Sequence, residues 1–348
     1  MIEAKEIRLT EFSHGSGCGC KIAPAVLEQI LAKSEKKKFS KLLVGNETRD
    51  DAAVYDLGNG SALISTVDFF TPVVDDAFDF GRIASANALS DVYAMGGKPL
   101  LATAILGWPV EKLPAELASA VLKGAEDICA KANIPLAGGH SIDAVEPFFG
   151  LSVNGVVKKE NLKANSTAME GDVIFLTKPL GSGILSTAIK RKLANPDDYN
   201  AAVEMMTSLN EVGEKLGELK SVTSLTDVTG FGLLGHLIEM AEGSDLTAII
   251  NYPDIRVEEA AKKFIARMCF PDNLFRNWNA YEKKVDAAEG SWFIPLCDPQ
   301  TNGGLLAAVS PGAAEEFLKI LKQNGIHSVT KPIGRFTSKE KFPVKIIL

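Results

Sequence analysis

The feature that most limits the possible folds is the alternation of strand-like and helix-like segments along the whole chain. Short apolar or alternating runs, typical of strands, occupy residues 52–57, 62–69, 100–106, 150–157, 172–178 and 305–310. Segments with helical periodicity occupy residues 79–95, 113–132, 185–194, 200–219 and 312–325. Alternation of this kind predicts a mixed α/β architecture of the α+β type.

Chain length and one polar stretch predict two domains. The 348 residues exceed the roughly 250–300 at which single cores stop growing. Residues 158–172 are polar and lack apolar periodicity, which indicates a connection between domains. We therefore expect an N-terminal domain over residues 21–160 and a C-terminal α/β domain over residues 170–348. A mobile glycine-rich segment is expected before them, at residues 1–20.

Composition excludes several classes of protein. The formal charge of −7 and the pI near 5.3 disfavour binding to a nucleic-acid backbone. The most apolar stretch, residues 100–110, is far shorter than the roughly 20 residues that span a bilayer. The N-terminal residues lack the apolar core of a signal peptide. We therefore expect a cytoplasmic protein that binds no membrane and keeps its five cysteines reduced.

Five aspartates lie near the ends of predicted elements and are candidates for a cation site: Asp50, Asp51, Asp68, Asp91 and Asp227. Magnesium prefers oxygen ligands and is usually held by a few carboxylates together with nucleotide phosphates. A zinc site is poorly supported, because the four histidines form no zinc-binding spacing. Each aspartate has an alternative structural role, and Asp227 in particular could cap the helix expected after it.

Phosphate binding has no standard motif in this chain, which contains neither a P-loop nor a dinucleotide fingerprint. Four glycine-rich turns are expected instead, at residues 94–99, 136–143, 227–235 and 300–304. Backbone N–H groups in such turns can bind anions, although glycine pairs also simply close tight turns. Lys21 and Arg49 are the natural cationic partners for phosphate, and Lys21 could equally be a solvated loop residue.

The stretch HGSGCGCK, residues 14–21, places Cys18 and Cys20 among glycines and next to a lysine. An exposed thiol beside a cation ionises more easily than usual. A metal ligand pair and a redox pair are possible, but a nucleophile or chalcogen-handling thiol on a mobile flap is favoured. Cys129 and Cys297 are expected to be buried, and Cys269 has no assigned role.

The quoted segments, together with LLVGNETRDDAAV, STVDFF, NALSDVYAMGGKP, LAGGHSIDA, TKPLG, LTDVTGFGLLGH and LCDPQTNGGLL, resemble the selenophosphate synthetase (selenide, water dikinase) family in order and spacing. The resemblance covers about residues 7–310. It implies the two-domain fold of the aminoimidazole ribonucleotide synthetase superfamily, with ATP bound by the N-terminal domain. It also implies a homodimer in which the N-terminal domains pair into a β-barrel. The implied reaction converts selenide, ATP and water to selenophosphate, AMP and orthophosphate, which supplies activated selenium for selenocysteine and selenouridine formation.

The same resemblance implies a role for individual residues. Cys18 and Lys21 match catalytic positions, and Asp51, Asp91 and Asp227 match magnesium ligands. The matched ATP-binding positions are Lys21, Thr48, Arg49, Asp50, Asp68, Asp91, Gly139, His140 and Ser141, the last three reaching the nucleotide across the dimer. Asn302 stands where serine is usual, and Cys20 receives no role.

Two alternatives stay open: another ATP-dependent enzyme of the same superfamily, and a nucleotide-gated selenium carrier. The route by which selenium arrives also stays open, including a selenium-delivery protein.

Overall fold

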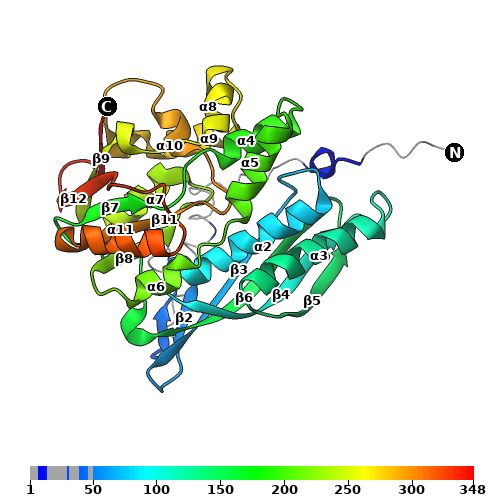
Figure 1. The fold of residues 1–348 in the computed structure, drawn as a ribbon, viewed down its shortest axis with the longest axis horizontal. Coiled ribbons are helices and arrows are strands. Elements are labelled where there is room, and N and C mark those ends of the chain that lie inside the picture. The colour runs from blue at the N-terminus through cyan, green and yellow to red at the C-terminus, as the bar shows by residue number, and fades with distance from the viewer. Residues whose placement is uncertain (1–6, 14–29, 31–38, 46–49) are drawn as a thin grey trace.

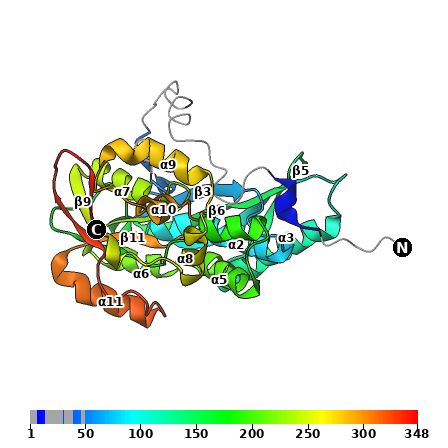
Figure 2. The same ribbon diagram turned by 90° about the horizontal axis from the view of Figure 1, so that it is seen from above.

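The computed structural model describes residues 7–13, 30, 39–45 and 50–348. Five of the predicted site or loop residues lie outside these ranges: Cys18, Cys20, Lys21, Thr48 and Arg49. The described chain forms two sheets with helices packed on them, and the two sheets lie toward opposite ends of the molecule (Figures 1 and 2). Within the described residues, no helix is long and apolar enough to cross a membrane.

The first sheet has six strands in the order β1-β2-β3-β6-β4-β5. Their bounds are Leu42–Val44 (β1), Ala53–Asp56 (β2), Ser61–Phe70 (β3), Lys98–Trp108 (β4), Leu136–Asp143 (β5) and Phe148–Lys158 (β6). All neighbours pair antiparallel except β4 and β5, which are parallel because helix α3 (Ala115–Lys131) connects them.

Helices α2 (Ala77–Ala94) and α3 cover one face of this sheet (Figure 1). The side chain of Asp76 caps α2 by accepting a hydrogen bond of 2.8 Å from the backbone N–H of Asp79. Small residues let the two helices approach closely, since a Cβ at Gly81 would lie only 1.9 Å from the carbonyl oxygen of Val121. In the described part of the chain, the helices with the most contacts to this sheet, α2 and α3, both lie on this one face.

The second sheet has seven strands in the order β10-β13-β9-β12-β7-β11-β8. Their bounds are Val173–Leu176 (β7), Val222–Asp227 (β8), Leu246–Asn251 (β9), Val285–Asp286 (β10), Leu305–Val309 (β11), Gly334–Ser338 (β12) and Val344–Ile347 (β13). The helices of this part are Ser182–Lys190 (α4), Pro196–Thr207 (α5), Val212–Glu218 (α6), Gly232–Gly243 (α7), Glu259–Ala266 (α8), Asn273–Tyr281 (α9), Phe293–Cys297 (α10) and Ala314–Gln323 (α11).

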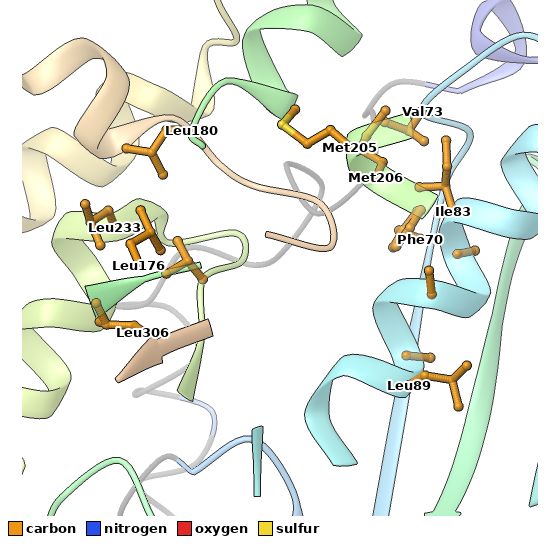
Figure 3. Close-up of a cluster of buried hydrophobic side chains, with 14 of the residues drawn as sticks. Phe70, Val73, Ile83, Leu89, Leu176, Leu180, Met205, Met206, Leu233 and Leu306 are labelled. Carbon is orange, nitrogen blue, oxygen red and sulfur yellow. The ribbon is translucent and has the colours of Figure 1, made fainter. Parts of the chain in front are cut away.

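The two parts share a continuous apolar interior. Helices α5 and α6 and the edge strand β8 all pack against α2. Figure 3 shows Met205 and Met206 of α5 between the apolar side chains of the first part, such as Ile83, and those of the second sheet, such as Leu176. Helix α2 is therefore buried on nearly all sides, and polar residues on it must find partners within the protein.

Two sequence predictions are wrong, and one alternative role is excluded. Residues 200–219 form two helices, because Asn210 between them bonds to Ser90 Oγ and to the carbonyl of Gly303, both at 2.8 Å. Residues 136–143 form strand β5, in which the glycine pair produces a register shift opposite Ala102–Ala104 instead of a turn. Asp227 ends β8 and caps no helix, since the N-cap position of α7 is Phe231.

Candidate functional site

Three of the predicted metal ligands come together where the two parts of the chain meet. Asp51 lies just before β2, Asp91 lies on α2 and Asp227 is the last residue of β8. Burial raises the pKa of Asp51 well above its usual range, and the charges of Asp227 and Asp91 raise it further. Carboxylates from three distant segments therefore form one acidic cluster, in which Asp227 is buried and Asp51 and Asp91 are partly buried.

Two buried threonines orient this cluster. Thr226 donates from Oγ1 to Oδ1 of Asp51 at 2.9 Å, and Thr66 donates from Oγ1 to Oδ2 of Asp91 at 2.5 Å. Both threonines were missed by the sequence reasoning. Their positions carried a signal, since Thr66 lies two residues before Asp68 on the same face of β3 and Thr226 directly precedes Asp227.

Of the two other predicted acidic residues, Asp50 lies beside the cluster and Asp68 contacts the same helix, α2. Asp50 accepts a hydrogen bond of 2.8 Å on Oδ1 from the backbone N–H of Asn165, and its charge acts on Asp51. Asp68 accepts a hydrogen bond of 2.5 Å on Oδ2 from the side-chain amide of Asn87 on α2. Asp91 therefore lies on α2 and Asp68 is bonded to it, whereas Asp50 and Asp51 precede β2 and Asp227 ends β8.

The chemistry of the cluster fits magnesium bound together with a triphosphate. Oδ2 of Asp51 is buried and has no hydrogen-bond partner among the described residues, as expected for an oxygen that awaits a cation. No three His, Cys, Asp or Glu side chains in the described ranges form a ready-made metal site. Magnesium does not require one, because it keeps waters and takes further oxygens from phosphate.

The predicted strip Gly139, His140 and Ser141 is not brought to the acidic cluster within one chain. These residues lie on β5 at the far edge of the first sheet, separated from β3 by β6 and β4. All three are exposed. A single chain therefore holds the carboxylates and this strip apart.

The cysteines inside the described ranges are not candidates for chemistry. Cys129, Cys269 and Cys297 are free and buried, as expected for the first and last of them. Burial raises the pKa of the Cys129 thiol to about 11 and that of Cys297 further still. Neutral thiols of this kind are poor nucleophiles, so the reactive candidates remain Cys18 and Cys20, outside the described residues.

Comparison with known proteins identifies the family. The chain matches the family model of the AIR synthase related protein N-terminal domain over residues 49–157 and that of the C-terminal domain over residues 169–347. It is 51% identical to a selenide, water dikinase of Pseudomonas putida, over 99% of this chain and 100% of that one. It is 53% identical to a selenide, water dikinase of Yersinia pseudotuberculosis, over 96% of each chain.

A solved structure shows the same fold at low sequence identity. The thiamine-monophosphate kinase of Stenotrophomonas maltophilia superposes with a TM-score of 0.66 at 18% identity, covering 94% of this chain and 96% of that one. The two-domain α/β fold expected from the sequence resemblance is thereby confirmed. On these matches, the chain belongs to the selenide, water dikinase family of the AIR synthase related proteins.

Proposed function

We propose that this protein is an ATP-dependent enzyme that converts selenide, ATP and water to selenophosphate, AMP and orthophosphate, and so supplies activated selenium for selenocysteine and selenouridine formation. One observation carries the proposal: about half of the residues are identical, over nearly the full chain, to proteins named selenide, water dikinase. The acidic cluster supports it, because phosphoryl transfer from ATP needs a cation site beside the triphosphate.

The reaction has two phosphoryl steps. In the first, the bond between the γ-phosphorus and the β–γ bridging oxygen breaks, and a phosphorus–selenium bond forms. In the second, water cleaves the remaining phosphoanhydride of the ADP-level species, which gives AMP and orthophosphate. We assign Asp51, Asp91 and Asp227 to hold Mg²⁺, which when bound neutralises phosphate charge and stabilises the charge that develops on the transferring phosphoryl oxygens.

The remaining assignments follow the chemistry of each side chain. Lys21 and Arg49 bind phosphate oxygens, with Thr48, Asp50 and Asp68 at the nucleotide. Cys18 binds or delivers selenium, and the neighbouring Lys21 lowers the pKa of its thiol. Selenide is itself a strong nucleophile, so Cys18 need not attack phosphorus. A cytoplasmic location belongs to the proposal, because this thiol must stay reduced.

A homodimer is part of the proposal, built through the open face of the first sheet. Odd-numbered residues of β3 point away from α2, and among them Val67 and Phe69 are 55% and 50% exposed. Leu100 on β4 and Ile142 on β5 add further exposed apolar surface. Pairing of two such sheets into a β-barrel would bury this surface. It would also bring His140 and its neighbours on β5 toward the nucleotide of the partner.

Phosphorus NMR of the protein with ATP, Mg²⁺ and selenide tests the proposed reaction. We expect a selenophosphate resonance together with AMP and orthophosphate, and no selenophosphate without selenide. Formation of ADP without AMP would favour another ATP-dependent enzyme of the superfamily. An unchanged ATP spectrum, with selenium bound to the protein, would favour a nucleotide-gated carrier.

A further inference from the structure

We propose that Asn87 and Asn302 form a positioning pair that orients the Asp68 carboxylate for the nucleotide. The pair links the two parts of the chain, since Asn87 lies on α2 and Asn302 lies in the glycine-rich turn before β11. This inference deepens the proposed function, because it rests on the assignment of Asp68 to the ATP site.

Both polar atoms of the Asn87 side-chain amide form hydrogen bonds, and the partners determine how the amide is oriented. Nδ2 donates to Oδ2 of Asp68 at 2.5 Å, and Oδ1 accepts from the backbone N–H of Asn302 at 2.7 Å. A carboxylate can only accept and an N–H can only donate, so the amide cannot be flipped. Asn87 is completely buried, which makes the loss of either bond costly.

Other hydrogen bonds hold Asn302 in place and so fix the direction of its backbone N–H. Its Nδ2 donates to the carbonyls of Met206 and Ser208 at the C-terminal end of α5, both at 2.8 Å. Its own carbonyl accepts from Nζ of Lys178 at 2.9 Å. The φ of Asn302 is +47°, a left-handed conformation that asparagine tolerates better than most residues.

The glycines after Asn302 hold the turn close to β7 and β8. A Cβ at Gly303 would lie 2.0 Å from the carbonyl oxygen of Val228, and one at Gly304 would lie 2.4 Å from the backbone nitrogen of Lys178. The turn therefore has little room to move. A rigid donor at Asn302 fixes Asn87, and Asn87 selects one rotamer of Asp68.

Helix α2 has a second hydrogen-bonded connection to the same turn. This connection allows an effect on the orientation of Asp68 to be distinguished from an effect on stability. Ser90, one turn after Asn87 on α2, accepts from Nδ2 of Asn210 at 2.8 Å, and Asn210 also bonds to the turn at the Gly303 carbonyl. This link joins the same helix to the same turn but does not contact Asp68. Ser90→Ala is therefore the matched control for a change at Asn87.

The test is the affinity for ATP with Mg²⁺, measured by calorimetry without selenide, alongside thermal unfolding. Asn87→Asp keeps an acceptor for Asn302 but sets a second carboxylate oxygen against Asp68. We expect about 10–100-fold weaker ATP binding, the range typical of groups that support a ligand-binding side chain. Ser90→Ala should lower stability but leave the ATP affinity within about twofold, because a single hydrogen bond is lost away from Asp68.

Asn302→Ser is the second variant and keeps the backbone N–H while it removes the two bonds to α5. We expect ATP binding weakened by about two- to tenfold in the folded variant, with KM for ATP raised more than kcat falls. Equal losses of affinity in Asn87→Asp and Ser90→Ala would overturn the inference. So would wild-type affinity in both asparagine variants.

These outcomes are distinguishable from failure of the proposed function. A wild-type protein that binds ATP and Mg²⁺ but forms no selenophosphate contradicts the proposed reaction. The binding measurements still decide the role of the asparagine pair in that case, because they use no selenide.

Discussion

In the metal-free protein, the acidic cluster should lower the free energy of unfolding. The variant Asp51→Asn measures by how much. The substitution keeps the shape of the side chain and an oxygen that can accept from Thr226, which now donates to Asp51 at 2.9 Å. It removes a charge that burial, Asp227 and Asp91 all disfavour. An amide N–H₂ also replaces Oδ2, which has no hydrogen-bond partner among the described residues, and can donate to a neighbouring carboxylate.

The magnitude follows from the cost of an unpaired buried polar group. That cost is on the order of 1–3 kcal/mol. With an unfolding entropy of about 2.1 cal/mol/K per residue, a chain of 348 residues should gain about 1.5–4 °C in Tm.

The sign of the pH dependence is opposite to that of an ordinary salt-bridged acid. The pKa of Asp51 is higher in the folded state than in the unfolded state, so the folded protein binds more protons. Ionisation of Asp51 therefore lowers stability as the pH rises from about 4, the unfolded value, through the raised folded value. The advantage of Asp51→Asn should be largest at alkaline pH and should vanish at acidic pH.

Thermal unfolding at several pH values in chelator, repeated with ATP and Mg²⁺, is the assay. With ATP and Mg²⁺ bound, the wild type should be more stable than Asp51→Asn. Binding removes the repulsion among the wild-type carboxylates, whereas the variant has lost a proposed cation ligand. Asp56→Asn is a control of opposite sign, since Lys159 lowers the pKa of the partly exposed Asp56. The small stabilisation that the Asp56–Lys159 pair gives is present above the ordinary pKa of aspartate. It is lost as the pH falls through the lowered pKa of Asp56. A variant Asp51→Asn that is less stable than wild type at pH 8 without metal would refute the reasoning.

Three further predictions concern Cys18, Lys21 and the proposed dimer. Cys18→Ser should abolish selenophosphate formation while ATP affinity stays within about twofold; wild-type product rates by phosphorus NMR would contradict a necessary role for this sulfur. Lys21→Ala should lower ATP turnover by about 100-fold even without selenide, and unchanged ATP hydrolysis would rule out its phosphate contact. Phe69→Lys, on the open sheet face, should weaken dimerisation by at least about tenfold in sedimentation experiments. Val110→Lys, at a site that is 64% exposed and outside the strands, should leave dimerisation unchanged. A loss of dimer in both variants would count against the proposed interface.

Local patterns predicted much of the fold. Alternation in residues 62–69 corresponds to β3, and the helical periodicity of residues 79–95 and 113–132 corresponds to α2 and α3. These predictions succeed because the period of side-chain burial is a property of neighbouring residues. The predictions over residues 136–143 and 200–219 are wrong because pairing with β4 and hydrogen bonds from Asn210 override local preference.

The sequence by itself determined which residue types are available: a mixed α/β pattern, five aspartates at element ends and a thiol pair beside a lysine. Only the tertiary structure decided that Asp51, Asp91 and Asp227 share one cluster, and that His140 lies away from it on the far edge of the sheet. It also decided which neutral groups orient the aspartates: Thr66 bonds to Asp91, Thr226 to Asp51 and Asn87 to Asp68. The physical reason is that burial and hydrogen bonding between distant segments depend on how the sheets and α2 pack, which no local period encodes.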